Sequence, residues 1–394
     1  MFRRGLSVKL LIMPHIAVIT STRADWGLLS GPTRALASRD GVRVSIVATN
    51  MHLSEAHGHT IDEIIRDGFD VDERVEMPQD GDKPLDRARA MGVCLSGMAE
   101  ALDRLRPDCV VVLGDRYEIL AGSCAAAMLS IPIVHLHGGE TSLGAIDEQM
   151  RHAITKLSTL HLASTESHRR RIISMGEDPA RVINTGAIGV WNALHARLPS
   201  HEELVASLDG FDINSRDTLV VTYHPATADH SSSPAEQFGN FLKALDSRPE
   251  LRVLITGANN DAGGGEITRM TQKWVAANSR RVLSVASLGY RRYLAALRDC
   301  AACVGNSSSG IIEAPSMHIP TVDIGLRQCG RTASESVIHC GDKTSEIVAA
   351  IDLALSPEFR AKAADAPNPY EHPDTLRLMT DSIVGFCNSL TNKR

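Results

Sequence analysis

The stretch VVVLGDRYEILAGSCAAAMLSIPIVHLHGGETSLGAIDEQMRHAITK, residues 110–156, decides the fold. Its run VVVL ends in Gly-Asp-Arg (114–116), and its run IPIVHL ends in His-Gly-Gly-Glu (137–140). Continuous apolar runs of this length are typical of parallel strands that are buried on both faces. The Ala-rich segment 117–129 between them predicts a helix, so the stretch forms a strand–helix–strand unit of a parallel sheet.

Polar side chains follow both strands of this unit. Because ligands of open α/β sheets bind outside the carboxyl ends of the strands, we expect six residues near one another: Asp115, Arg116, His137, Glu140, Asp147 and Glu148. Carboxylates and a histidine beside an arginine indicate acid–base chemistry on an anionic substrate. Asp115 could instead cap the following helix. Asp147 and Glu148 could open the next helix, where Arg151 would pair with Asp147.

The rest of the chain repeats this pattern. Strands and helices alternate from residue 15 to 185 and again from 218 to 355, and the composition changes across 186–210. We therefore predict an α/β protein with two Rossmann-like domains, 14–190 and 191–373, that face each other. Within it, 84–105 and 272–278 are predicted to be helices and 218–222 a strand, and 76–84 and the glycine-rich 257–266 are predicted to be loops.

Composition narrows the class of protein. A length of 394 residues favours two domains. The net charge of −6 offers no basic surface to nucleic acid or to an anionic membrane. No apolar run approaches the roughly 20 residues that span a bilayer. The eight scattered cysteines fit reduced thiols, so a cytoplasmic location is expected. Cys300 and Cys303 form a C-x-x-C pair without a second pair at metal spacing, so no metal site is predicted.

The segment Asn-Ser-Ser-Ser-Gly (306–310) closes a predicted strand and opens a helix, where hydroxyls and free amides can hold an anion. It lacks the lysine of a P-loop, so a diphosphate fits better than a triphosphate held by a Walker motif. Ser307 and Ser308 are the candidate ligands, although a simple N-cap cluster is the structural alternative. Glu313, one turn further, could bind a ribose diol or could only complement the helix dipole.

Other strand ends supply further candidates. Arg23 and Ala24 lie in the polar turn after the first strand, which is a natural phosphate or base site. His224 ends a strand and could act as a cation for phosphate, as a general acid or as a structural residue. Arg327 could reach a phosphate or a uracil edge. The glycine-rich 257–266 lacks the G-x-G-x-x-G register of dinucleotide sites, so it is a loop or a ligand contact.

Eight motifs occur in order between residues 15 and 331: T-R-A-D-W-G, G-D-R, H-L-H-G-G-E, A-I-D-E-Q-M-R-H-A-I-T-K, H-P, N-x-D-A-G, G-N-S-S-S-G-I-I-E-A and G-L-R-Q-x-G-R. The series resembles the hydrolysing UDP-N-acetylglucosamine 2-epimerases of sialic and legionaminic acid synthesis. The resemblance implies the GT-B fold, with two Rossmann-like domains facing across a cleft that holds the nucleotide. It also implies that the C-terminal helix, 374–392, packs back on the first domain, and that the enzyme is a homodimer or homotetramer.

The implied reaction uses no metal and no cofactor. The C2 proton is removed, UDP leaves C1 to give 2-acetamidoglucal, and water adds to give N-acetylmannosamine. By motif, the resemblance places contacts to UDP or the sugar on Arg23, Ala24, Arg116, Glu148, Arg151, His224, Asn259, Ser307, Ser308, Glu313 and Arg327. It places the catalytic groups on Asp115, His137, Glu140, Asp147 and His224.

One position departs from the family pattern. Many relatives carry an acid where this chain has His137. Histidine moves protons near neutral pH, and Glu140 or Glu148 could take the acid's role.

Three alternative functions stay open. The same chemistry could act on UDP-2,4-diacetamido-2,4,6-trideoxyglucose of the legionaminic acid route. A GT-B glycosyltransferase would use the same UDP site with an acceptor pocket. A non-catalytic nucleotide-sugar sensor would leave the clustered acids without a role.

Overall fold

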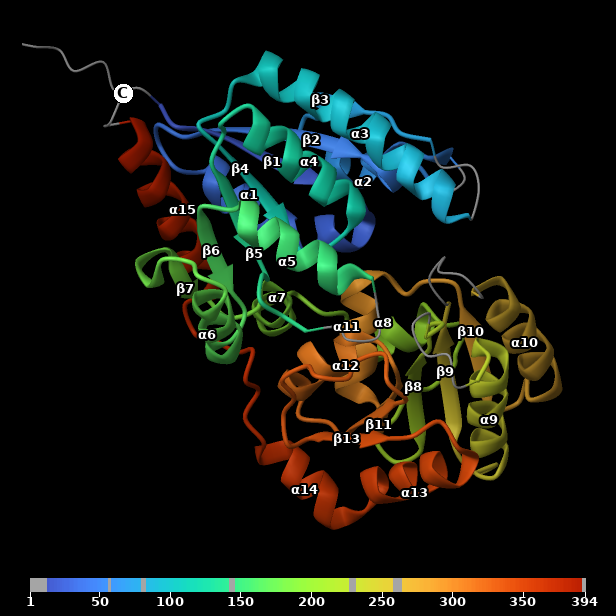
Figure 1. Ribbon diagram of the computed structural model, residues 1–394. Coiled ribbons are helices and arrows are strands. Elements are labelled where there is room, and N and C mark those ends of the chain that lie inside the picture. Colours follow the sequence, from blue (N-terminus) through green and yellow to red (C-terminus); the bar gives the residue numbers. More distant parts are fainter. Residues whose placement is uncertain are drawn as a thin grey trace, which may run out of the picture.

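A computed structural model describes residues 13–55, 58–78, 83–141, 146–226, 232–257 and 264–391. Within these residues the chain builds two parallel sheets, one of seven strands and one of six, each covered by helices (Figure 1). Helices and strands alternate along the chain, as the sequence predicts.

The first sheet has the strand order β3-β2-β1-β4-β5-β6-β7. Its strands are β1 (His15–Thr20), β2 (Arg43–Thr49), β3 (Glu73–Val75), β4 (Cys109–Leu113), β5 (Ile133–Leu136), β6 (Leu160–Ala163) and β7 (Val182–Asn184). Its helices are α1 (Arg23–Ala37), η1 (Asn50–Leu53), α2 (Ile61–Arg66), α3 (Pro84–Leu105), α4 (Tyr117–Met128), α5 (Asp147–Leu157), α6 (Glu166–Ser174) and η3 (Pro179–Arg181).

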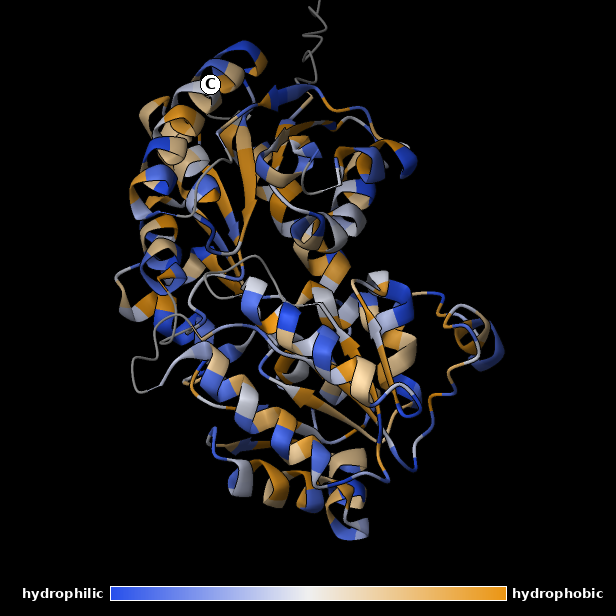
Figure 2. Ribbon diagram, turned by 90° about the vertical axis from the view of Figure 1, so that its right-hand side faces the viewer, coloured by the Kyte–Doolittle hydropathy of each residue, from blue (hydrophilic) through white to orange (hydrophobic). Residues whose placement is uncertain are grey.

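Side chains of β1 alternate between two cores because successive residues of a strand point to opposite faces. Ile16 and Val18 pack with residues of α1 and α2, whereas Ala17 and Ile19 pack with residues of α3 and α4. Figure 2 shows the apolar strands enclosed by helices whose polar residues face outward. The strand order reverses between β1 and β4, and such a switch point is where ligands of doubly wound sheets bind.

The second sheet has the order β10-β9-β8-β11-β12-β13 and reverses between β8 and β11. Its strands are β8 (Thr218–Thr222), β9 (Arg252–Thr256), β10 (Val282–Val285), β11 (Ala302–Gly305), β12 (Thr321–Ile324) and β13 (Val337–Cys340). Its helices are α8 (His201–Ala206), α9 (Pro234–Asp246), α10 (Gly264–Ala277), α11 (Gly289–Asp299), α12 (Ser308–Ile312), η4 (Ala314–Met317), α13 (Thr344–Leu355) and α14 (Pro357–Asp365).

Two segments connect the halves. Helix α7 (Ile188–His195) contributes Ile188 to the core of the first half, while Val190 packs with Ile311 of α12. Helix α15 (Thr375–Thr391) returns to the first half, where Met379 and Cys387 are buried against the layer that contains α1 (Figure 1). The division of the domains at residue 190 stays a prediction, since α7 packs against both halves.

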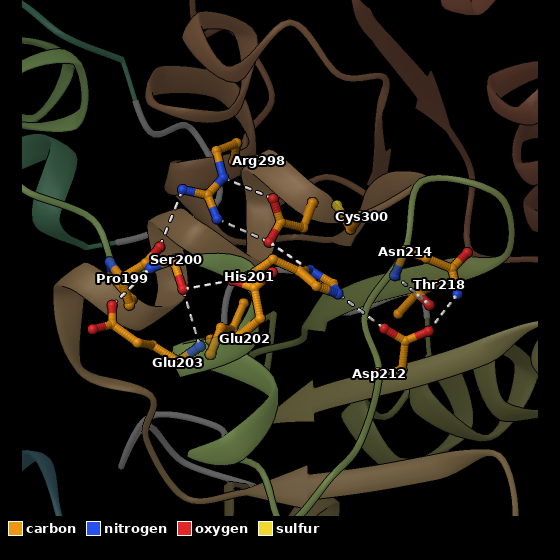
Figure 3. Close-up of polar contacts among 12 residues, drawn as sticks. Pro199, Ser200, His201, Glu202, Glu203, Asp212, Asn214, Thr218, Arg298 and Cys300 are labelled. Carbon is orange, nitrogen blue, oxygen red and sulfur yellow. Dashed lines mark hydrogen bonds and ion pairs between the residues drawn. The ribbon is translucent and has the colours of Figure 1, made fainter.

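His201 holds the start of the second half in place. Its ring nitrogens lie 3.2 Å from Asp299 and 3.1 Å from Asp212 (Figure 3). These acids precede β11 and β8, so this cluster lies at the amino ends of the strands, the opposite edge of the sheet from the predicted ligand site.

Some elements differ from the prediction. Strands β3 and β13 and helices α7, α8 and α14 were not predicted, because short edge strands and helices between domains lack a clear hydrophobic period. Helix α10 begins at Gly264 rather than at residue 272. Its first turn includes three residues of the glycine-rich segment, and burial of Ile267 and Trp274 outweighs the low helix propensity of glycine.

Candidate active site

Asp115 follows β4 and is paired with Arg151 of α5. Arg151 is 3% exposed and its guanidinium contacts Asp115 Oδ2, while Asp115 itself is 23% exposed. Glu148 lies 3.8 Å from the same guanidinium. Burial, reinforced by the positive charge of Arg331, lowers the pKa of Arg151 to about 9. The sequence therefore predicted correctly that Asp115 and Glu148 lie near one another, whereas the expected partner of Arg151 was Asp147 and not Asp115.

The loop after β5 has a backbone that the His-Gly-Gly-Glu sequence explains. His137 has φ +63° and Gly139 has φ +74°, both in the left-handed region. A Cβ at Gly139 would lie 2.6 Å from the carbonyl oxygen of His168, and one at Gly138 would lie 2.8 Å from His135 Nδ1. Both glycines are required by close packing, and together they set the direction of the His137 and Glu140 side chains.

Glu140 joins this loop to the second half of the molecule. Its Oε1 lies 3.3 Å from His137 Nδ1 and accepts a 2.7 Å hydrogen bond from Ser164. Its Oε2 accepts a 2.6 Å hydrogen bond from Arg331. Burial alone would raise the pKa of Glu140, but the charge of Arg331 and the hydrogen bond with His137 hold it well below its usual range.

Arg331 is a site residue that the sequence prediction missed. It lies 191 residues from Glu140 along the chain, so no spacing connects the two. The available signal was the final arginine of the motif G-L-R-Q-x-G-R, of which only Arg327 was selected.

Arg116 is held in place by a buried carboxylate. Its Nε donates to Glu118, which is fully buried and also accepts a 2.6 Å hydrogen bond from Asn50. Burial opposes ionisation of Glu118, yet the positive charge of Arg116 keeps its pKa below the usual value. Since the Arg116 side chain is 42% exposed, it can still face a ligand.

On the second sheet, Asn306 joins the ends of β8 and β11. Its side chain accepts from the His224 N–H at 2.7 Å and donates to the His224 carbonyl at 2.8 Å. Arg327 donates to the Asn306 carbonyl at 3.1 Å, so the structure brings His224, Asn306 and Arg327 together. Burial, assisted by Arg327, lowers the pKa of His224 to about 3. This lowered pKa favours a neutral imidazole, so of the roles expected for His224 it supports a hydrogen-bonding or structural one over a cation.

The serines lie beside this group. Ser307 is the N-cap of α12, but its side chain makes no capping hydrogen bond within the helix, so the structural alternative does not account for its hydroxyl. Glu313 follows α12, and burial raises its pKa to about 7. A Cβ on Gly189 of α7 would lie 2.4 Å from Glu313 Oε1, which places this carboxyl against the segment that connects the halves.

The remaining predicted residues lie at other strand ends. The guanidinium of Arg23 donates to Ser287 of the second half and lies 3.8 Å from Glu63, and Ala24 is exposed. Asp147 is the first residue of α5. Asn259 lies outside the described residues.

Contacts between the halves occur beyond the carboxyl ends of the strands. Glu140 follows β5 and contacts Arg331, which follows β12, while Arg23 follows β1 and contacts Ser287, which follows β10. The ligand-binding edges of the two sheets therefore face each other.

Within the described residues, no group of three or more His, Cys, Asp or Glu side chains is arranged to hold a metal ion. Burial raises the pKa of Cys303 to about 12, so this thiol is neutral. Across the same parts of the chain, no helix is both long and apolar enough to cross a membrane.

Solved structures confirm the fold class. The UDP-GlcNAc 2-epimerase from Neisseria meningitidis bound to UDP-GlcNAc matches 94% of this chain and 100% of its own, with a TM-score of 0.80 and 16% identity. The UDP-GlcNAc 2-epimerase from Methanocaldococcus jannaschii in complex with UDP-GlcNAc and UDP matches 94% and 99%, with a TM-score of 0.73 and 17% identity. The chain is thus an α/β protein with two Rossmann-like domains in the GT-B arrangement.

The sequence identifies the family. The model of the family described as UDP-N-acetylglucosamine 2-epimerase matches residues 34–384, and the chain belongs to this family of enzymes. It is 34% identical to the polysialic acid biosynthesis protein P7 of Escherichia coli, over 96% of this chain and 95% of that protein. It is also 34% identical to the UDP-N,N'-diacetylbacillosamine 2-epimerase (hydrolyzing) of Legionella pneumophila, over 86% and 89%. The counterpart from Campylobacter jejuni, the GDP/UDP-N,N'-diacetylbacillosamine 2-epimerase (hydrolyzing), is 32% identical over 88% of each chain.

Proposed function

We propose that this enzyme is a hydrolysing 2-epimerase that converts UDP-N-acetylglucosamine and water into N-acetylmannosamine and UDP for sialic-type acid synthesis. One observation carries the proposal: the edge of the first sheet that bears Asp115, His137 and Glu140 faces the edge of the second sheet that bears Ser307, Ser308 and Arg327. Proton-moving groups and an anion-binding edge thus lie on opposite sides of one site.

The second half would bind UDP. Ser307 and Ser308 offer hydroxyls and backbone amides to the diphosphate, and Arg327 offers a charge. The neutral imidazole of His224 can donate an N–H bond, and Glu313 can accept from ribose hydroxyls. Arg23 and Arg116, from the first half, complete the cationic surroundings of the leaving group. These interactions stabilise the charge that develops as UDP departs.

The first half would move the protons. Removing the proton at C2 turns the C2–H electron pair into the C1=C2 bond, and the C1–O bond breaks with its electrons on UDP. Water then supplies a hydroxyl to C1 and a proton to C2 on the opposite face. Asp115, fixed by Arg151, is suited to exchange a proton at this site, since acid–base catalysis requires a positioned group. Asp147 and Glu148, in the first turn of α5, would hold or polarise the water.

A second candidate is the same reaction on UDP-2,4-diacetamido-2,4,6-trideoxyglucose. The relatives from L. pneumophila and C. jejuni carry names for that chemistry and are 34% and 32% identical to this chain. A UDP-GlcNAc 2-epimerase from Neisseria meningitidis is 29% identical. A GT-B glycosyltransferase has no such support.

The test compares both UDP-sugars with the purified enzyme at equal concentrations, with UDP release and the free sugar measured by NMR. The proposal predicts that UDP-N-acetylglucosamine is hydrolysed with the higher kcat/KM and yields the manno product. A higher kcat/KM for the diacetamido sugar would select the second candidate. UDP release only after addition of a sugar acceptor would indicate a glycosyltransferase, and binding without turnover would indicate a sensor.

A further inference from the structure

We infer that His137 Nε2 is the base that removes the C2 proton, and that Glu140 is not itself a base but the positioning residue that orients His137. The inference rests on the proposed function, because it assigns roles within that reaction. It replaces the role that the sequence suggested for Glu140, which was direct catalysis.

Both carboxylate oxygens of Glu140 already have partners within the protein. Oε1 lies 3.3 Å from His137 Nδ1 and 2.7 Å from Ser164 Oγ, and Oε2 lies 2.6 Å from Arg331. The Glu140 side chain is 5% exposed, against 23% for Asp115, and an enclosed carboxylate that is paired with a guanidinium is a poor proton acceptor.

The same contacts fix which nitrogen of His137 carries hydrogen. An ionised carboxylate only accepts hydrogen bonds, so the nitrogen that faces it, Nδ1, must be the donor. In the neutral imidazole the other nitrogen, Nε2, is then an unprotonated acceptor. This is the arrangement in which a partner sets the tautomer of a catalytic histidine.

His137 Nε2 has no hydrogen-bond partner within the described part of the protein, so it can accept a proton or a hydrogen bond from a ligand. The atom is buried, and no residue among those described lies within hydrogen-bonding distance of it. An unsatisfied buried polar atom destabilises the folded state. The left-handed backbone of His137 adds a second local cost. Two local costs at one residue, in a loop at the ligand-binding edge, point to a functional constraint.

Charges on several elements surround this pair. Arg331 comes from the loop after β12, His168 from α6 and Glu313 from the segment after α12. Ser164 holds one oxygen of Glu140 from the first half, and Arg331, which belongs to the half that would bind UDP, holds the other. The orientation of His137 is thereby connected to the presence of both halves around the substrate.

In the reaction, Nε2 forms a bond to the C2 proton, and the C2–H electron pair becomes the C1=C2 bond. The C1–O bond breaks and its electron pair leaves on the β-phosphate of UDP. The imidazolium then releases its proton to solvent, while water provides the hydroxyl at C1 and the new proton at C2. The negative charge of Glu140 stabilises the imidazolium that forms.

Glu140→Gln tests the positioning role. Arg331 cannot accept a hydrogen bond, so the amide oxygen must face Arg331 and the amide nitrogen must face His137. This orientation forces the hydrogen of His137 onto Nε2 and removes the base. We expect kcat to fall about 100-fold or more, in the range of a lost acid–base group, with KM and the Kd of UDP within about threefold of the wild type. Glu140→Asp keeps an acceptor and should retain at least about tenfold more activity than the Gln variant.

His137→Asn is the second variant, because asparagine tolerates the left-handed backbone at this position. It should bind UDP normally, release no UDP from UDP-N-acetylglucosamine and incorporate no deuterium at C2 in D2O. Wild-type turnover measured alongside separates the two claims: an inactive wild type contradicts the proposed function. If the wild type turns over and His137→Asn or folded Glu140→Gln keeps its kcat, this inference alone is overturned. The inference would also be overturned if Glu140→Gln lowered kcat and UDP affinity equally and Glu140→Asp showed the same losses. That result would indicate a structural role for Glu140.

Discussion

Asp115, at the end of β4, forms an ion pair with the buried guanidinium of Arg151 in the second turn of α5. The pair joins a strand end to the helix that follows the next strand, so it fixes the carboxylate in the site. It also satisfies a guanidinium that is only 3% exposed and would be costly to leave unpaired.

Asp115→Asn should therefore have two separable effects. Loss of the carboxylate should lower kcat by about 10²-fold or more, as expected for a positioned acid–base group. Loss of the ion pair between Asp115 and Arg151 should also lower the melting temperature. UDP affinity, measured by calorimetry, should stay within about threefold, because the proposed UDP contacts lie mainly on the second sheet. Near-wild-type turnover in the variant would rule out a catalytic role for Asp115.

Ser308→Ala addresses the proposed diphosphate site. Removing one hydroxyl that binds a charged phosphate should weaken UDP binding by about 5- to 30-fold, given about 1–2 kcal/mol for such a hydrogen bond. Ser233→Ala is the matched control, since Ser233 is the N-cap of α9 and its hydroxyl accepts from the Glu236 amide at 3.2 Å. The control should lower stability and leave the Kd of UDP unchanged. An unaltered Kd in Ser308→Ala would count against the phosphate site.

Glu313 predicts a pH dependence of stability. Burial raises its pKa from 4.5 to about 7, so between these values the folded protein holds a proton that the unfolded chain has lost. Its contribution to stability is greatest below pH 4.5 and decreases as the pH rises toward 7. Glu313→Gln removes the ionisation, and at pH 8 it should stabilise the protein by roughly 1–3 kcal/mol relative to its effect at pH 5.

Thermal unfolding of wild type and Glu313→Gln at pH 5 and pH 8 measures this difference. Glu358→Gln, on the exposed first turn of α14, is the control with an equal change in charge. It should change the melting temperature by the same amount at pH 5 and at pH 8. A benefit of Glu313→Gln that is equal at both pH values, or larger at pH 5, would contradict the raised pKa.

Gly189→Ala tests the contact between α7 and the second half. The added Cβ would lie 2.4 Å from Glu313 Oε1, so the carboxyl or the helix must move. Overpacking costs about 1–3 kcal/mol. If Glu313 binds the ribose, displacing it by this amount of energy should weaken UDP binding by about 5- to 150-fold. Gly385→Ala in α15, where a Cβ would have nothing within 4 Å, should bind UDP as the wild type does. Equal UDP affinities for the two variants would argue against a role for Glu313 in binding.

The sequence predicted the elements whose signals are local. Helix α3 begins at Pro84 and ends at Leu105, as predicted, because proline favours the first turn and Arg106-Pro107 ends the helix. Strand β8 likewise has the predicted bounds, since a continuous apolar run between polar segments indicates a buried parallel strand. The strand-end rule placed Asp115, His224 and Arg327 at the carboxyl ends of their strands, where the structure has them.

The missed features depend on partners that are distant in sequence. Arg331 meets Glu140 only because the two halves come into contact, and no periodicity reports that. The ion pair between Arg116 and Glu118 was not predicted. Residues two apart in sequence do not face each other on a helix, so their spacing gives no signal of a contact. The role inferred for Glu140 changed for the same reason: the residue types were visible in the sequence, but which nitrogen of His137 faces Glu140 depends on the position of that carboxylate.

One measurement tests the central claim directly. The wild-type enzyme is incubated with UDP-N-acetylglucosamine in D2O, and the products are followed by proton and phosphorus NMR. Elimination followed by hydration predicts stoichiometric UDP together with N-acetylmannosamine that carries deuterium at C2. Recovered free sugar with hydrogen retained at C2, or an unchanged UDP-sugar, would contradict the proposed reaction.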